Sequence, residues 1–439
     1  MTENTTTPPP MLKLRLSIMM FLQYAIWGAW LPLLWSFLMD YRKFAASQIG
    51  DMFAVGAVGA IVAPFIAGQI ADRYFSTERY LGVSHLIGAV LVWMLAQATG
   101  YWEFLGLSLA YSLVYSPTLP LTNSLSFHHL TDRDRDFGKV RAWGTVGWIA
   151  VGIGIGQWLL HRHTPADASV EQVLAAQAAG KADAFKLSAI LGVIMGLYCF
   201  TLPHTPPAKE KKTNAAFAAM GAVKRQPLLM LFLLAVPVSC IHQFYFVHTA
   251  GFLGRFQSTM ASRINDIVGV GGGGLMTVGQ MAEFLVLAAM PLMAKSLSRK
   301  TLLAIGLLAY ASRMALFAYV GPISAATGIA EVAVLITGVA LHGLCFGCFI
   351  FVSFMIVDEE TSGDIRASAQ SLYNLVIIGV GTIVGSKIAG MVSDWASAGG
   401  SQPTDYTRLF SVPMWGALAC LAILLVAYPY RKAGPVPAA

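Results

Sequence analysis

Charged residues are scarce in this chain. Of its 439 residues, 12% are Asp, Glu, Lys or Arg, and 56% are hydrophobic. Soluble proteins carry about 25% charged residues, so this composition excludes an ordinary soluble domain. The formal net charge of +7 does not indicate a nucleic-acid partner, because the basic residues lie in loops between apolar runs. The composition therefore predicts a polytopic protein embedded in a lipid bilayer.

Cysteine is also rare, and all five cysteines lie inside apolar runs. A cysteine buried in such a run acts as a small hydrophobic residue. Cys345-x-x-Cys348 has the spacing of a redox or zinc motif, but neither a second pair nor polar neighbours accompany it. The loops carry neither a metal-binding cluster of His, Asp and Glu nor a nucleophile elbow. We therefore expect no metal, no cofactor and no enzymatic activity.

Twelve apolar segments are long enough to cross a membrane. Each is expected to be a helix, because only helices satisfy every backbone polar group within a single segment in lipid. The segments cover residues 16–38, 48–70, 80–99, 104–126, 141–160, 186–203, 228–251, 273–293, 301–320, 328–356, 367–393 and 408–429. The predicted fold class is all-α, with twelve transmembrane helices.

A polar connection at residues 204–227 divides these segments into two blocks of six. We predict an N-terminal six-helix bundle over residues 16–203 and a C-terminal six-helix bundle over residues 228–430, joined by a cytoplasmic linker. Residues 1–15 are expected to be a disordered N-terminus, and residues 431–439 a tail. Most of the 29 Lys and Arg residues fall on the side that holds the linker and both ends. This asymmetry predicts that both termini are cytoplasmic.

The two blocks of six with a basic central loop resemble the major facilitator superfamily, in which two similar halves move about a central solute site. After the second segment, Gly68-Gln-Ile-Ala-Asp72-Arg73 resembles that superfamily's G-x-x-x-D-R loop motif. The alternative for Asp72 is an ordinary acidic residue in a loop.

An acidic residue lies at the centre of an apolar segment. Glu283 stands with Gln280 in the run 275–293. A carboxylate there costs about 2.5–3.5 kcal/mol on insertion scales, and such residues normally face a wet cavity and handle a solute or a proton. Residues three apart share one helix face. The alternative is a structural pair with another helix: Lys387 is one candidate partner, and Arg313 raises the same question.

Polar residues open the fifth segment in the sequence VRAWGTVGW. Helical spacing places Thr145 on the same face as Arg141, with Trp148 close by. A guanidinium, a hydroxyl and a flat aromatic face together suit a solute that carries rings and hydroxyl groups. The alternative for Arg141 is a residue at the cytoplasmic end of the helix whose long side chain reaches back to water.

Two further segments carry candidate contacts. Gln243 in the seventh segment can both donate and accept hydrogen bonds. Phe346 in the tenth can stack on a base, although an aromatic residue in a membrane helix usually serves packing. Buried histidines are more often satisfied structural groups than proton carriers, so His242, His248 and His342 are not assigned a catalytic role.

Seven motifs, in order along nearly the whole chain, resemble the bacterial nucleoside:proton symporter family of the major facilitator superfamily. They are FLQYAIWGAWLP, YSPTLPLTNSLSF, VRAWGTVGW, TLPHTP, QMAEF, SRMALFAY and IRASAQSLYN. The resemblance implies a secondary transporter that moves nucleosides across the inner membrane by alternating access, coupled to proton entry. We expect it to act as a monomer.

The resemblance also implies a substrate-binding set, within which Glu283 is the candidate for proton coupling. That set is Arg141, Thr145, Gln243, Gln280, Glu283 and Phe346. The family's tenth segment carries an aspartate directly after the aromatic residue, but this chain has Gly347 there, and Phe246 replaces an expected asparagine. The loss of one hydrogen bond from a polar pocket can change its substrate. A transporter of a sugar, nucleobase or drug, an uncoupled facilitator, and a sensor without turnover therefore stay open as alternatives.

Overall fold

The computed structural model describes residues 10–66, 75–131, 133–206, 221, 223–256, 266–270, 273–361, 366–398, 401 and 403–429. Its described elements are all helical, and these ranges contain no strand. The motif at residues 68–73, most of the linker at 204–227 and the tail at 431–439 lie outside the described residues.

The predicted membrane segments are confirmed as helices. Eleven helical stretches of the described chain are long and apolar enough to span a membrane. A shorter apolar helix, Ala46–Val62, coincides with the second predicted segment. Each of the other eleven predicted segments overlaps one of the longer stretches, which confirms the all-α polytopic fold.

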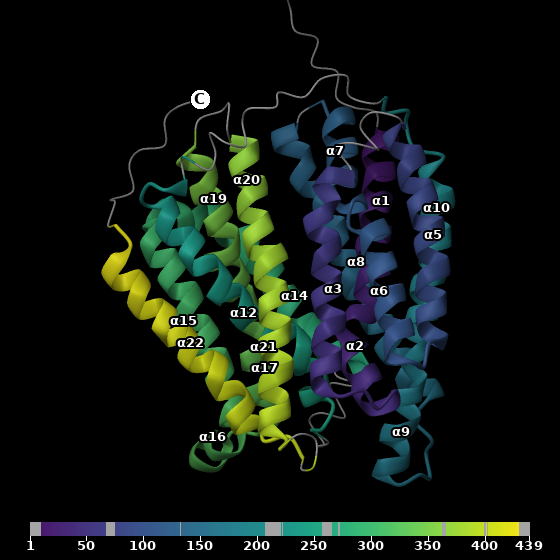
Figure 1. Ribbon diagram of the computed structural model, residues 1–439, viewed down its shortest axis with the longest axis vertical. Coiled ribbons are helices and arrows are strands. Elements are labelled where there is room, and N and C mark those ends of the chain that lie inside the picture. The colour runs from purple at the N-terminus through teal and green to yellow at the C-terminus, as the bar shows by residue number, and fades with distance from the viewer. Residues whose placement is uncertain are drawn as a thin grey trace, which may run out of the picture. The chain divides into compact units, whose positions relative to one another are not determined.

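The chain divides into two compact units (Figure 1). The first comprises Met1–Phe44, Val55–Glu210 and Arg263–Gly274, and the second comprises Ala45–Ala54, Lys211–Ser262 and Leu275–Ala439. A short stretch from each half of the sequence thus packs with the other unit. The boundary predicted within residues 204–227 stays a prediction.

The first unit is built around α1, which packs against both α8 and α10, while α5 packs against α10 and α6. Helix α3 starts in the second unit and continues into the first. The elements are α1 (Pro10–Trp30), η1 (Leu31–Leu33), α2 (Leu34–Ser36), η2 (Phe37–Tyr41), α3 (Ala46–Ile66), α5 (Thr77–Gln97), α6 (Tyr101–Tyr115), α7 (Thr118–His129), α8 (Arg133–Arg162), α9 (Val170–Gly180) and α10 (Ala182–Cys199).

In the second unit α15 packs against α22 and η4, and α12 packs against α21. The elements are α12 (Leu228–Leu253), α14 (Gly273–Ser296), α15 (Arg299–Ala318), α16 (Val320–Thr327), α17 (Glu331–Ala340), α18 (His342–Leu344), η4 (Cys345–Phe351), α19 (Val352–Glu359), α20 (Arg366–Asn374), η5 (Leu375–Val380), α21 (Gly381–Ala396) and α22 (Tyr406–Ala427).

Local breaks in the long helices have identifiable causes. Pro32 lies at the start of η1, where the first spanning helix tightens into a 3-10 turn. Pro237 lies inside α12 and Pro291 inside α14. The tenth spanning helix widens into a π-helix over Cys345–Phe351, a feature that often marks functional sites. That π-helix contains Phe346 and Gly347.

Candidate functional site

Helix α14 carries the acidic residue and the amide predicted from the sequence. Gln280 is buried, and its Oε1 has no hydrogen-bond partner among the described residues. The side chain of Glu283, one turn later on the same helix, is 18% exposed. The structure therefore places a partly accessible carboxylate next to an unsatisfied buried acceptor.

The carboxylate of Glu283 faces a histidine that follows α17. His342 Nε2 lies 3.4 Å from Glu283 Oε2, and the His342 side chain is almost completely buried. Two glycines allow the helices to come this close. A Cβ at Gly343 would lie 2.5 Å from the backbone of Ala282, and one at Gly279 would lie 3.2 Å from His342 Cβ.

The opposite side of the imidazole meets Arg313, which is fully buried in α15. Arg313 Nη1 lies 3.0 Å from His342 Nδ1. The guanidinium also lies over the rings of Tyr245, at 4.3 Å, and Tyr310, at 5.1 Å. Its Nε and Nη2 have no hydrogen-bond partner within the described ranges. Stacking on two aromatic faces therefore supplies much of the environment of this buried charge.

Helix α12 completes the surroundings of His342 with aromatic rings. The ring of Tyr245 stacks on His342 with centroids 4.6 Å apart, and His242 stacks on it at 5.5 Å. His242 Nδ1 in turn shares a hydrogen bond of 2.7 Å with the Tyr310 hydroxyl. The sequence showed His242, His342 and Arg313 as isolated polar residues but not their contacts, because these come from three separate helices.

Two predicted site residues lie at the edge of this group. The Phe346 ring lies 6.4 Å from the His342 ring, one turn further along the helix. Gln243 turns toward α21, where its Nε2 donates to Ser386 Oγ at 3.0 Å. The structure thus gathers Glu283 and Phe346 around His342, while the amide nitrogen of Gln243 is engaged elsewhere.

The first unit contains the remaining predicted pair. Both Arg141 and Thr145 are half-buried on α8. The Arg141 guanidinium lies 4.0 Å from the centroid of the Tyr24 ring. Nearby, Trp27 and Trp148 meet edge to face with centroids 5.8 Å apart. Trp148 of α8 therefore packs against an aromatic residue of α1, Trp27.

A buried polar network in the first unit was not predicted. Gln23 Nε2 donates to Thr118 Oγ1 at 2.8 Å, and His85 Nε2 lies 3.0 Å from Gln23 Oε1. The Tyr115 hydroxyl donates to the Gln23 carbonyl at 2.5 Å. Both polar atoms of the Gln23 side-chain amide therefore have a suitable partner: the nitrogen has a hydroxyl oxygen, and the oxygen has an imidazole nitrogen. This network therefore has the character of a structural link between α1, α5 and the α6–α7 break.

The family model described as the nucleoside H⁺ symporter matches residues 11–433. YegT of Escherichia coli (strain K12) is 33% identical over 388 residues, covering 87% of this chain and 84% of YegT. The xanthosine permease of the same organism is 28% identical over 430 residues, covering 95% of this chain and 96% of the permease.

A crystal structure of the nucleoside transporter NupG superposes on this chain with a TM-score of 0.81 and 25% identity, covering 96% of this chain and 100% of NupG. The chain belongs to the nucleoside H⁺ symporter family. It is therefore a multi-pass membrane transporter of nucleosides with proton coupling, not an enzyme, and its fold is that of the major facilitator superfamily.

Lys387 of this symporter does not take the role of partner to Glu283. It forms an ion pair with Asp51, at the start of α3 and within the second unit. Arg313 contacts His342, and His342 contacts Glu283, so Arg313 lies close to the acid. Glu283 therefore has a polar neighbour, His342, on another spanning helix.

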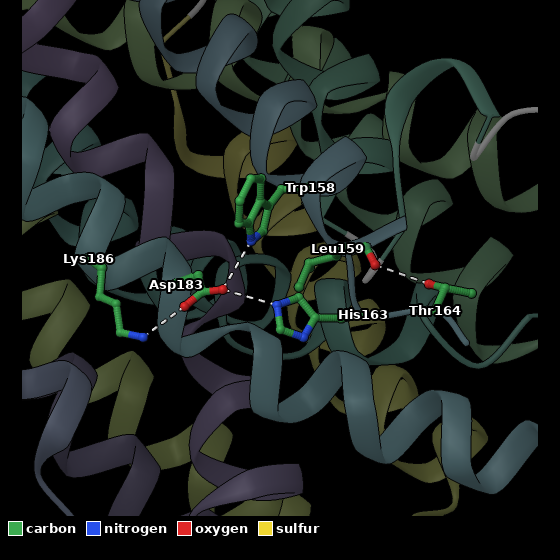
Figure 2. A network of polar contacts seen from close by, with 6 residues as sticks. All are labelled: Trp158, Leu159, His163, Thr164, Asp183 and Lys186. Carbon is green, nitrogen blue, oxygen red and sulfur yellow. Dashed lines mark hydrogen bonds and ion pairs between the residues drawn. The ribbon is translucent and has the colours of Figure 1, made fainter. Parts of the chain in front are cut away.

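A second cluster of charged side chains holds the end of α8 against α10 (Figure 2). Asp183 accepts hydrogen bonds from Trp158 Nε1 at 3.0 Å and Lys186 Nζ at 2.9 Å, and its Oδ2 lies 3.0 Å from His163 Nε2. All of these side chains are partly exposed. The geometry suits a helix-end clamp in the symporter.

Two other kinds of ligand site, a metal site and an apolar pocket that binds a nucleoside, are unsupported by the described residues. Those residues contain no group of three or more His, Cys, Asp or Glu that could hold a metal ion. A pocket in the second unit is lined only by apolar side chains, among them Phe256, Leu275 and Val339. Such a lining offers no side-chain hydrogen bond to a nucleoside.

Proposed function

We propose that this symporter takes up nucleosides across the inner (plasma) membrane, driven by proton entry, as a monomer with both termini in the cytoplasm. The excess of Lys and Arg in the loops on one side supports that orientation. Membership of the nucleoside H⁺ symporter family supports the coupling to protons.

Gln280 and Glu283 form the polar centre of the proposed nucleoside site. The observation that carries this assignment is the buried Oε1 of Gln280, which has no hydrogen-bond partner in the described part of the chain. A buried acceptor left unsatisfied costs about 1–3 kcal/mol. A hydroxyl or N–H group of a nucleoside would satisfy it, while the adjacent carboxylate would accept a second hydroxyl.

The other predicted residues take supporting roles in the proposed site. Phe346 is half-buried next to His342, and its ring offers a face to the base. Gln243 offers its amide oxygen, since its nitrogen already donates to Ser386. Arg141 and Thr145 of the first unit contact the nucleoside during the transport cycle, and their partial exposure on α8 is consistent with that role.

Glu283 is the proposed proton-binding group. It is a carboxylate on a spanning helix, and its side chain is partly exposed. The residue at position 347, where the family resemblance leads us to expect a second acid, is a glycine. Of positions 283 and 347, only position 283 carries an acid in this chain, so we assign proton coupling to Glu283.

Uptake of radiolabelled uridine into proteoliposomes tests these assignments. Wild-type uptake should accelerate when the outside is acidic relative to the inside. Glu283→Gln should lose that acceleration but keep exchange of external for internal uridine at equal pH. Glu359→Gln is a matched control, because Glu359 pairs with Arg299 in a partly exposed ion pair outside the proposed site. Gradient-independent uptake in both wild type and Glu283→Gln would reject the proton role of Glu283.

The set of binding residues is tested by ligand-dependent thermal shifts. A ligand at 100 times its Kd stabilises the folded protein by about 2.7 kcal/mol through mass action. Nucleosides should raise the Tm of the wild type, whereas Gln280→Leu should show a reduced rise at the same concentration. An equal rise in both proteins would remove Gln280 from the site.

A further inference from the structure

The hydrogen bonds around His342 determine where its proton lies. Arginine has only donors, so Arg313 Nη1 must donate to His342 Nδ1, 3.0 Å away. Nδ1 is therefore the unprotonated nitrogen, and a neutral imidazole carries its single proton on Nε2. Nε2 is also the ring nitrogen that lies near Glu283, with 3.4 Å between it and Oε2.

We propose that Arg313 and His342 are positioning residues for proton coupling: Arg313 holds His342 as the neutral Nε2–H tautomer, which donates a long hydrogen bond to Glu283. This proposal rests on the proposed role of Glu283 and assigns to it a dedicated supporting pair. It also excludes His342 as a proton carrier, because the nitrogen that would accept a second proton is occupied by a donor.

The surroundings of His342 support a fixed imidazole. Its ring is stacked against Tyr245 and His242 of α12, which restricts rotation of the imidazole about its side-chain bonds. Gly343 and Gly279 hold the backbone close enough for the contact with α14. The titratable and charged groups near His342 are His242 and Tyr245 of α12, Glu283 of α14, Arg313 and Tyr310 of α15, and Cys345 on the following turn.

The imidazole lies between two groups of opposite charge. Arg313 is a permanent cation with no exposed surface, and two of its nitrogens lack hydrogen-bond partners among the described residues. His342 links it to the carboxylate of Glu283 as a bridge between opposite charges. Burial of an uncompensated charge is costly, so this bridge favours the ionised form of Glu283 between transport events.

The coupling step then involves one proton and one acceptor. A proton from the outer solution adds to a carboxylate oxygen of Glu283, forming a carboxylic acid, and the hydrogen bond from His342 Nε2–H to that carboxylate weakens. The same proton leaves from Glu283 to the inner solution, and the carboxylate recovers its donor. His342 keeps its own proton throughout, and no bond other than O–H forms or breaks.

Two substitutions at position 342 separate positioning from packing. Gln keeps both functions of the histidine, since its amide oxygen accepts from Arg313 and its nitrogen donates to Glu283. Phe keeps a flat ring for Tyr245 but removes both hydrogen bonds. His248→Phe is the matched control, because His248 is also buried in the second unit and lies 3.1 Å from a backbone carbonyl of α21.

The readout is the pH dependence of uridine uptake, with exchange at equal pH as a measure of folded, binding-competent protein. His342→Phe should move the midpoint of the profile to higher pH by about one unit or more, because the ionised carboxylate loses a donor. His342→Gln and His248→Phe should keep the wild-type midpoint. An unchanged midpoint in His342→Phe, or a His342→Gln profile shifted as far as that of His342→Phe, would overturn the proposal.

A measurement on the unmodified symporter decides the case if His342→Phe does not fold. Nitrogen NMR of histidine-labelled protein, with His342 assigned by comparison with His342→Gln, reports the tautomer directly. Its signal should stay that of a neutral Nε2–H imidazole across the pH range of uptake, and an imidazolium signal would refute the inference. If Glu283→Gln retains gradient-driven uptake, the proton role of Glu283 fails, whereas the tautomer result identifies a failure of the positioning role separately.

Discussion

Substitutions at Gly347 should reveal a steric conflict with α14. A Cβ at this position would lie 2.6 Å from Val286 Cγ1 and 3.4 Å from Met290 Cε. Carbon atoms pack at about 3.5–4.0 Å, so Val286 would have to move by about 1 Å. Valine in a helix has one strongly preferred rotamer and does not yield easily, whereas methionine adapts. The site that the family resemblance assigns to an aspartate is thus filled by a neighbouring side chain.

The size of the conflict follows from known costs of overpacking. Extra atoms forced into a packed region cost about 1–3 kcal/mol. An alanine in place of glycine also improves helix propensity by up to about 1 kcal/mol, which partly hides that cost in the single variant. For Gly347→Asp, a carboxylate at the centre of a spanning helix adds about 2.5–3.5 kcal/mol on insertion scales. Gly347→Asp should therefore be less stable than Gly347→Ala.

A double-mutant cycle isolates the steric contribution. Tm values are measured for the wild type, Gly347→Ala, Val286→Ala and the double variant in the same detergent. The propensity effect cancels in the cycle, so the coupling should be favourable by about 1–3 kcal/mol, because Val286→Ala opens the space that the new Cβ needs. Additivity within about 0.5 kcal/mol would refute the claim that Val286 excludes a side chain at position 347.

Two further outcomes are expected. In the uridine uptake assay, Phe346→Ala should raise the KM about tenfold and leave Vmax nearly unchanged, because loss of base stacking costs about 1–3 kcal/mol. Phe346→Trp should restore most of the affinity in the same assay. Asp183→Asn should lower the Tm by a few degrees while uptake of uridine persists, because the substitution removes the charge that binds His163 and Lys186 at the end of α8. A loss of uptake at unchanged Tm would contradict the clamp role.

The sequence predicted the fold well because the membrane restricts what an apolar segment can form. Each of the twelve predicted segments coincides with a helix, since length and hydrophobicity alone identify spanning helices. The predicted division into two bundles at residues 204–227 stays a prediction. Ala45–Ala54 belongs to the second unit, whereas the described residues 266–270 and 273–274 belong to the first. No local pattern distinguishes such segments from their neighbours along the chain.

The site was only partly predictable. The energetic cost of Glu283 identified α14 as important without knowledge of its neighbours. The partner of Glu283 depends on the close approach of α14 to the tenth spanning helix at Gly343, which a single sequence does not reveal. Lys387 illustrates the same limit: it is a charge in an apolar segment like Arg313, yet its partner is Asp51 and not the acid of α14.

Two of the buried polar networks in the described part of the chain differ in how completely their side-chain atoms are paired. Around Gln23 in the first unit, both atoms of the side-chain amide have partners, which is the normal condition of a buried amide. Around Glu283, by contrast, Gln280 Oε1 and the Tyr245 hydroxyl are buried without hydrogen-bond partners among the described residues. Each such atom costs about 1–3 kcal/mol while it lacks a partner. Under the proposed function, a hydroxyl or N–H group of the nucleoside completes the bond to Gln280 Oε1 and offsets that cost.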